Sequence, residues 1–462
     1  MTVNALNTSV RSRPKPIGLI AAAVASLVAL SSVIAQTPTP VSLSLGDAAR
    51  LAAKQNAGAV AARYRAEQAD ARVTQRRADL LPNASASVLE NGRTLNTATF
   101  GIDFPSPPGQ PPVFDPDGQL EGPVNILDSR AHFSQSLFDA SALGRVKSAR
   151  TAAAASDFDA DAAADQAAAI AAAAYVRAAR ADAQLGARVA DSSLAEDLLR
   201  IAREQVSAGV GVGLDVTRAQ SQLAAVRAQL IVARNDRGRA RLELLRTLGL
   251  SLDSRLTLTD SLADLYIEDS LPPVTDAIAR AFRSRADLRS IDAQLTAIDQ
   301  QTSAIRAERL PSVSAFGDYG VVGKNGASLL PTYNWGVQFS LPIFDGLRRE
   351  GRVEEQTALH REIDVRRHDL HEQASVEVRT ALLDLASARE AVAAARERVR
   401  LAEQEVSQAS ERFRAGVAGN ADVFTASISL NGARTQVVDA LAAYQTARVS
   451  LARAQGEARE IR

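Results

Sequence analysis

Several residue types are missing or scarce in this chain, and each absence narrows what the protein can be. There is no cysteine among its 462 residues, which excludes thiol chemistry, disulfides, cysteine-based zinc sites and an N-terminal lipid anchor attached through cysteine. Neither sign of charge is in excess, since Lys plus Arg and Asp plus Glu number 53 each, so nothing indicates nucleic acid as a partner. Aromatic residues make up only 4%. A large globular core needs more, so extended helix-on-helix packing is favoured.

Residues 1–35 are predicted to be a signal peptide. Arg11, Arg13 and Lys15 precede the apolar run IGLIAAAVASLVALSSVIA, which ends at a small-residue cleavage site before Gln36. A retained membrane helix is the alternative, because the run is near spanning length. The polar, proline-containing start that follows Gln36 favours cleavage. The protein is therefore expected to be exported.

The rest of the chain contains two copies of one unit. RADLLPNAS returns as RAERLPSVS, FSQSLFD returns as FSLPIFD, and the stretch around Asp215 returns around Asp422. We therefore predict a first repeat at 36–249, an irregular linker at 250–273, a second repeat at 274–457 and a tail at 458–462. Each repeat is expected to run helix, strand, loop, strand, long helix, helix.

The stretch EQVSAGVGVGLDVTRAQSQL raises the question of a phosphate-binding loop, because three glycines precede a helix. Only Gly209 has a counterpart in the second copy, Gly416, and the residues before it have helical periodicity with no β-run. A dinucleotide or phosphate loop would follow a buried strand. Both copies instead indicate a helix, a glycine stop and a new helix, with Asp215 and Asp422 expected as N-caps.

A heptad seam is the strongest periodic signal, and it follows each corner. Its members are Val216, Ala219, Leu223, Val226, Leu230, Ala233, Arg237, Ala240 and Leu244 in one copy, and Val423, Ala426, Leu430, Ala433, Val437, Ala440, Tyr444, Ala447 and Leu451 in the other. Each copy should thus form an antiparallel helical hairpin. The proline-free segments 139–209 and 345–416 predict continuous helices of roughly 100 Å. Helices predicted at 45–81 and 215–248, if placed end to end, would together be as long as the helix predicted at 139–209.

Period-two alternation predicts strands between the helices. Tyr333, Trp335, Val337, Phe339 and Leu341 alternate with polar residues, and 312–322, 83–100 and 124–138 complete two strand pairs. Half of an ordinary sandwich is one interpretation. In an exported protein, we favour lipid-facing strands of an outer-membrane barrel. Four strands cannot close around an open lumen, so three chains are expected to supply twelve.

Together these motifs resemble the TolC-like outer membrane efflux protein family over essentially the whole mature chain. The resemblance rests on the duplication, the LPxxS and F-D joints and the AGV(x)4DV corner. It implies a mainly helical protomer that trimerises into a 12-stranded outer-membrane β-barrel continued by a periplasmic α-helical barrel. In that family the corners form a periplasmic tip, where an adaptor (membrane fusion) protein linked to an inner-membrane transporter docks. The residues implied at this tip are Gly209, Val210, Leu214, Asp215, Gly416, Val417 and Asp422.

The resemblance also implies a pore constriction at Asp422. Thr425 stands where the family's best-known pattern has a second acid, so the ring would hold three carboxylates. Ala418 replaces a frequent arginine and Phe413 lacks a phenolic hydroxyl, so packing is expected to be the main link between the hairpins.

The function expected is a passive exit duct of a tripartite efflux or type I secretion system, with no enzymatic activity, cofactor or metal. His368, His371 and Glu372 have ligand-like spacing on one helix, but a solvated polar stripe is the better interpretation. The cargo, small amphiphile or polypeptide, stays open. A periplasmic or surface coiled-coil protein without a pore is the alternative, and it predicts that Tyr333, Trp335 and Phe339 face protein.

Overall fold

A computed structural model describes most of the chain. The described residues are 41–100, 108–109, 118, 120–263, 270–324, 326, 328–415, 417 and 419–461. The predicted signal peptide, most of the loop that joins the first two predicted strands, and Gly416 lie outside them.

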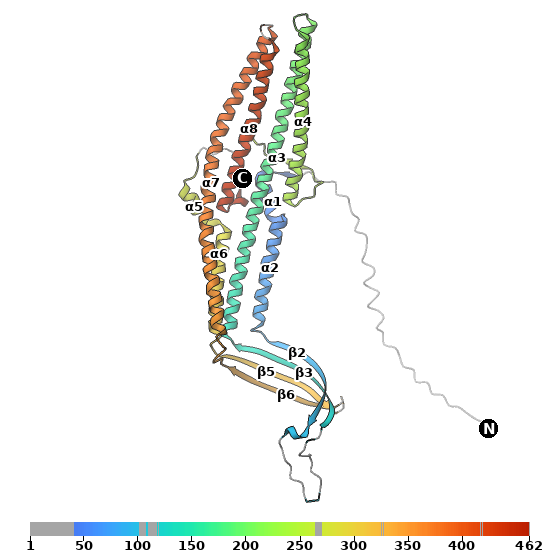
Figure 1. Ribbon diagram of the computed structural model, residues 1–462, viewed down its shortest axis with the longest axis vertical. Helices are drawn as coiled ribbons and strands as arrows, with labels where there is room; N and C mark the ends of the chain where they lie inside the picture. Colours follow the sequence, from blue (N-terminus) through green and yellow to red (C-terminus); the bar gives the residue numbers. More distant parts are fainter. Residues whose placement is uncertain are drawn as a thin grey trace, which may run out of the picture.

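Two unbroken helices run the length of the helical part (Figure 1). They are α3 (Ala140–Ser207), with 68 residues, and α7 (Arg348–Arg414), with 67. At 1.5 Å per residue each spans roughly 100 Å. The prediction of two long continuous helices is confirmed, and the absence of proline from both segments is its physical basis.

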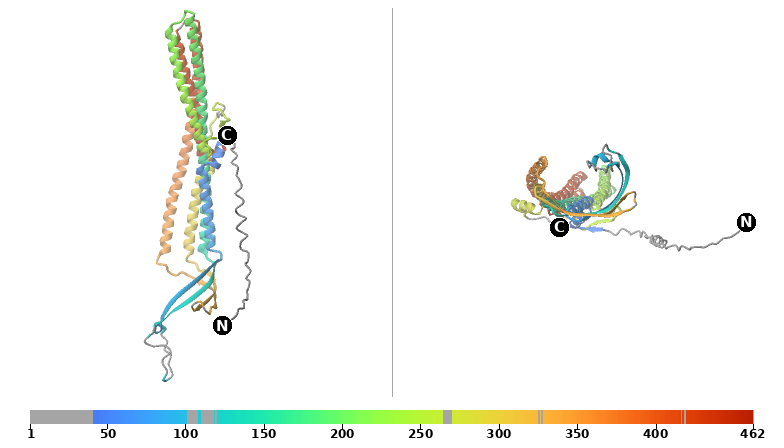
Figure 2. Two further views of the ribbon diagram at one scale, coloured as in Figure 1. Left: turned by 90° about the vertical axis from the view of Figure 1, so that its right-hand side faces the viewer. Right: turned by 90° about the horizontal axis from the view of Figure 1, so that it is seen from below.

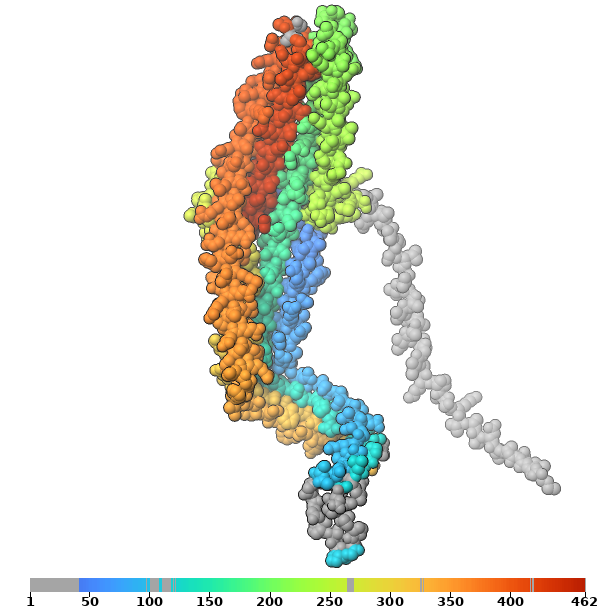
Figure 3. All heavy atoms as spheres, in the orientation of Figure 1, coloured from blue at the N-terminus to red at the C-terminus, as the bar shows by residue number. Residues whose placement is uncertain are grey.

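Shorter helices lie end to end along these two. Helices α2 (Ala57–Ala78) and α4 (Gly213–Leu248) pack on α3, one on each half, while α6 (Ala286–Ala307) and α8 (Asn420–Gln455) pack on α7 in the same way. Because α6 and α8 also contact α3, the two repeats form one continuous layer of helices. Figure 3 shows α7, α8, α3 and α4 side by side in its upper half.

The prediction of a single helix over residues 45–81 was wrong, because the helix is interrupted at Asn56. There α1 (Leu45–Gln55) ends and α2 begins, with Asn56 at ψ 135°. Its side chain accepts a hydrogen bond from the Gly58 N–H and donates one to the Thr247 carbonyl at 2.8 Å. The side chain of Asn56 thus replaces helical continuity with a cap. The second repeat breaks likewise at Arg285, between α5 (Val274–Ser284) and α6.

Four strands form an antiparallel sheet at one end of the helices (Figure 1). In spatial order they are β2 (Asn83–Asn96), β3 (Leu120–Phe138), β5 (Ser312–Lys324) and β6 (Leu330–Ser340). The β2–β3 and β5–β6 pairings confirm the predicted strand pairs, although β2 ends at Asn96 rather than at residue 100. The pairing of β3 with β5 joins the two repeats. Within the described residues, β2 and β6 each have one edge without a strand partner.

The largest buried cluster lies midway along the helices, around a small parallel pair formed by β1 (Val41–Leu43) and β4 (Leu256–Leu258). Alanines from α1 and α3 dominate it, because small side chains allow close helix packing. Tyr175 is fully buried there, donating to the Leu43 carbonyl at 3.1 Å and accepting from the Asp260 N–H at 3.2 Å. The predicted linker therefore contains a strand, while the proposed repeat boundaries stay a prediction.

The helices form a curved layer when viewed from one end (Figure 2, right). Helix α5 and the C-terminus lie on its convex side. Among the described residues, none of the helices combines the length and hydropathy needed to cross a bilayer.

Candidate functional site

The tip of the molecule is formed by two hairpin corners, one between α3 and α4 and the other between α7 and α8 (Figure 1). Gly209 follows the end of α3 with φ +75°, in the left-handed region that favours glycine. Val210 and Leu214 are exposed beside it, and Val417 is exposed in the second corner. The prediction of a glycine stop is confirmed at Gly209.

The prediction that Asp215 and Asp422 cap the outgoing helices was wrong. Helix α4 begins at Gly213 after Val212, and α8 begins at Asn420 after Gly419, and neither start has a side-chain cap. Both aspartates therefore lie inside the first turn, where a carboxylate still interacts favourably with the helix dipole. Asp422 is exposed at 58%, with its carboxylate 4.0 Å from Arg412 across the corner, and Thr425 is exposed one turn further on.

The heptad seams are buried as predicted, although less deeply in the first copy. Ala219, Leu223 and Val226 are buried in α4, and Ala426, Leu430 and Ala433 in α8. Arg237, the one charged seam position, bonds Asp182 of α3 at 2.6 Å, so the break in the apolar pattern is an ion pair across the hairpin.

Hydrogen bonds also join the two hairpins at the tip, and the sequence analysis missed them. The Asn420 side chain donates to the Asp215 carbonyl at 3.0 Å, and the Gln205 side chain donates to the Phe413 carbonyl at 2.9 Å. Asn420 is only 2% exposed. Below them Phe413 and Val423 pack with Leu198 and Ile201 of α3 in an apolar cluster. Packing is therefore only part of the link.

A second polar link lies further along the α3–α8 interface. Asp191 of α3 is buried between Arg188 and Arg434, at 3.1 and 2.9 Å, and Arg188 also bonds Asn431 and Thr435 of α8. None of these polar residues occupies a heptad-seam position, so the seam pattern gave no signal for this link. Periodicity alone cannot say which of them face each other.

The sheet has one apolar and one polar face, as the alternation predicted. Tyr333, Trp335, Val337 and Phe339 project from β6 on one face, and each is at least 65% exposed. Register places Tyr319 of β5 on the same face, opposite Tyr333. Leu341, just beyond β6, is also exposed. Trp335 therefore does not lie in a single-chain core.

The other face of the sheet carries charged and amide side chains. Arg130 of β3 bonds Asp128 at 2.6 Å and Asp318 of β5 at 3.0 Å. Asn334 lies opposite Asp318 in the β5–β6 register. A sheet with such unlike faces separates an apolar from an aqueous environment.

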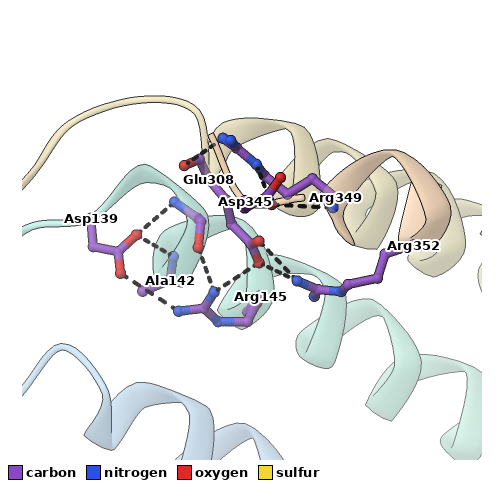
Figure 4. Close-up of polar contacts among 8 residues, drawn as sticks. Asp139, Ala142, Arg145, Glu308, Asp345, Arg349 and Arg352 are labelled. Carbon is purple, nitrogen blue, oxygen red and sulfur yellow. Dashed lines mark hydrogen bonds and ion pairs between the residues drawn. The ribbon is translucent and has the colours of Figure 1, made fainter. Parts of the chain in front are cut away.

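An ion-pair network joins the strands to the helices (Figure 4). Asp139 caps α3 by accepting from the N–H groups of Ser141 and Ala142, both at 2.9 Å. The F-D motif thus supplies the cap that the tip aspartates do not. Glu308 lies at the centre of the network, 2.8 Å from Arg352 and 3.7 Å from Arg145.

The second F-D motif uses its aspartate differently. Helix α7 starts after Leu347, and the Asp345 carboxylate accepts from the Arg349 guanidinium at 2.8 Å and from the Arg349 backbone N–H at 3.2 Å. Desolvation at this joint tends to raise the pKa of Asp345, but the Arg349 hydrogen bonds outweigh it and hold that pKa below its usual range. The joint therefore stays ionised and bridged at neutral pH.

The histidine stripe holds no ligand set. The ring of His371 makes an edge contact with Phe282, with 4.9 Å between ring centroids, while His368 and Glu372 are exposed. No group of three or more His, Asp or Glu side chains suited to a metal occurs in the described part of the chain.

The fold is therefore a curved layer of paired long helices continued by a sheet with one apolar and one polar face, a class of fold that solved outer-membrane channels share. The sequence profile described as "Outer membrane efflux protein" matches residues 49–250 and 277–457. The chain therefore belongs to the outer membrane efflux protein family.

Individual relatives agree with this assignment. Protein CyaE of Bordetella pertussis is 29% identical over 295 residues, which cover 62% of this chain and 60% of that relative. The CmeC outer membrane channel of Campylobacter jejuni is 20% identical, with a TM-score of 0.69 and 90% of this chain and 86% of that one covered. The MtrE outer membrane channel of Neisseria gonorrhoeae, solved in its open state, is 18% identical, with a TM-score of 0.71 and coverage of 89% and 88%.

Proposed function

We propose that this protein is the passive exit duct of a tripartite efflux or secretion system, as a homotrimer in the outer membrane that extends into the periplasm. The observation that carries the proposal is the sheet. It has one strongly apolar face, and its two outer strands, β2 and β6, each have an unpaired edge in the described chain. Exposed edges and a bare apolar face are unstable in water, whereas three copies would close twelve strands into a barrel.

In this barrel the apolar face meets lipid. Tyr333, Trp335, Val337, Phe339 and Leu341 would contact acyl chains, and the face with Arg130 and Asp318 would line the lumen. Twelve strands leave an interior wider than side chains can fill. The curved layer of helices would continue this lumen as a tube, with its concave side inward.

The gate is assigned to the hairpin tip. Three copies of Asp422, with Thr425 one turn away, would form a ring of carboxylates that narrows the entrance. Opening would separate helices that already exist, which is a repacking between two arrangements rather than unfolding. The hydrogen bonds from Asn420 and Gln205 would oppose that separation.

The partners proposed are a periplasmic adaptor and an inner-membrane transporter. The exposed apolar side chains Val210, Leu214 and Val417 would contact the adaptor, together with the backbone at Gly209 and Gly416 and the carboxylates of Asp215 and Asp422. The sequence contains no nucleotide-binding motif, so the energy for transport would come from the transporter.

The single tryptophan allows a sharp test of membrane position. Because Trp335 is the only one in the chain, intrinsic tryptophan fluorescence reports on that side chain alone. In vesicles whose acyl chains carry bromine, a lipid-facing Trp335 is quenched strongly, with Trp335→Phe as the blank. A protein-facing Trp335, which the alternative of a structural coiled-coil protein predicts, escapes quenching and would overturn the proposal.

Channel activity is measured separately. Purified protein in detergent should elute as a trimer and produce discrete conductance steps in planar bilayers. A monomer, or a trimer without conductance, would contradict the duct.

A further inference from the structure

An open groove of about 670 Å³ lies between α2, α3 and α6, in the half of the helical layer nearest the sheet. Alanines form much of its floor, among them Ala149 and Ala152 of α3. Its polar lining residues are Arg72, Gln75, Arg76, Asp79, Arg145, Ser148, Ser156 and Gln301.

Helix periodicity shows which side of the layer this groove opens on. Arg145, Ala149, Ala152 and Ser156 follow one another at steps of three and four, so they share one stripe of α3.

The opposite stripe of α3 is covered by other parts of the chain. Asp161 and Asp165 bond Arg459, near the C-terminus, at 3.2 and 2.6 Å. The C-terminus lies on the convex side of the helical layer (Figure 2, right). The groove therefore opens on the concave side, which lines the lumen if the proposed function holds.

Two arginines of the groove lack an acidic partner. The guanidinium of Arg76 makes no hydrogen bond or ion pair in the described structure, and that of Arg72 bonds only the Gln68 side chain, at 3.3 Å. They lie one turn apart on α2, where like charges repel. Arg145 differs, because Asp139 and Glu308 neutralise it at 3.6 and 3.7 Å.

Other lining groups complete the requirements of an anion site. The Ser156 hydroxyl and the Gln301 amide are donors without a partner in the described residues. Asp79 is the one lining carboxylate; it forms no ion pair with Arg76 and acts against an anion.

We propose that this groove binds the anionic group of a small organic molecule passing through the pore, a carboxylate, sulfonate or phosphate ester with a compact hydrocarbon part. Arg72 and Arg76 hold the charged group through charge-assisted hydrogen bonds, which are the stronger kind. The alanine floor takes the hydrocarbon part. The inference rests on the proposed function only for the statement that the ligand is in transit.

The test is equilibrium dialysis of naphthalenesulfonate against the full-length trimer in detergent, with empty micelles subtracted. Naphthol and naphthylmethylammonium serve as neutral and cationic analogues. The protein should bind the anion much more tightly than either analogue, and this binding should weaken as the salt concentration rises. Equal binding of all three would overturn the proposal.

Variants locate the binding. Arg72→Gln and Arg76→Gln should each lower the affinity for the anion roughly threefold to tenfold. Asp79→Asn should raise this affinity. Arg77→Gln is the matched control, because it removes the same charge one residue away, on the side of α2 that carries Asp70. An equal loss in Arg77→Gln, or no loss in the other two, refutes the site.

Inorganic phosphate separates a simple ion site from one for organic anions. It should compete more weakly than the sulfonate, since it has no hydrocarbon part to contact the alanines, and equal competition would refute the organic ligand. Dialysis needs no pore, so a failure of binding and a failure of conductance are distinguishable.

Discussion

Asn420→Ala is expected to open the channel, because it removes a hydrogen bond between the two hairpins. The Asn420 amide group is buried and donates to the Asp215 carbonyl at 3.0 Å. A neutral hydrogen bond contributes about 1 kcal/mol. Three copies in a trimer give about 3 kcal/mol, which corresponds to roughly a hundredfold change in the closed-to-open ratio.

The expected change is smaller than this upper value. Among the described residues the buried Asn420 side-chain oxygen has no hydrogen-bond partner, so its removal relieves an unfavourable term and offsets part of the destabilisation of the closed state. We therefore expect the open probability in planar bilayers to rise roughly tenfold to a hundredfold.

Ser427→Ala is the matched control. Its hydroxyl bonds the Val423 carbonyl at 2.7 Å within α8, so its loss weakens the helix without touching the other hairpin. An unchanged open probability in Asn420→Ala, or an equal rise in both variants, would refute the role of Asn420 in holding the tip.

Three further predictions address the gate, the corner and the core. Asp422→Asn should raise basal conductance or weaken cation block while the trimer stays intact; a channel unchanged in both respects would remove Asp422 from the pore. Gly209→Val should weaken adaptor binding, because a side chain at φ +75° costs about 1–2 kcal/mol even though no atom lies within 4 Å of the added carbon; normal adaptor affinity in a pull-down would contradict this. Tyr175→Phe leaves the Leu43 carbonyl and the Asp260 N–H without that partner, so the free energy of unfolding in denaturant should fall by about 1–3 kcal/mol, and an unchanged value would refute the role of the hydroxyl.

Tyr175 also predicts a pH dependence. Burial raises its pKa to about 12 in the folded protein, above the ordinary value of 10.0. The unfolded chain therefore loses this proton first, so the stability is complete below pH 10 and falls by roughly 2–3 kcal/mol per chain as the pH approaches 12. Tyr175→Phe should remove this part of the alkaline loss, and an identical pH profile in the variant would contradict the assignment.

Local features of the sequence determined the long elements. The absence of proline from 139–209 and 345–416 predicted α3 and α7, and period-two alternation predicted the apolar face around Trp335. These predictions held because such patterns extend over many residues, so one local exception does not change the element.

The ends of elements were predicted less well. Asp215 and Asp422 looked like N-caps, but α4 and α8 begin earlier, and the break at Asn56 was missed. A helix start depends on competition between neighbouring residues for the same backbone groups, and in the case of Asn56 a distant carbonyl, that of Thr247, also takes part.

By itself, then, the sequence determined a duplicated chain of two long helical hairpins and two strand pairs, with no thiol chemistry and an apolar sheet face. The tertiary structure alone decided which polar groups meet: Asn420 with Asp215, Asp191 with Arg434, and Arg72 of α2 with Gln301 of α6 along one open groove. Periodicity fixes the face of a helix on which a residue lies. Only packing fixes which neighbouring helix that face meets, and at what height along it.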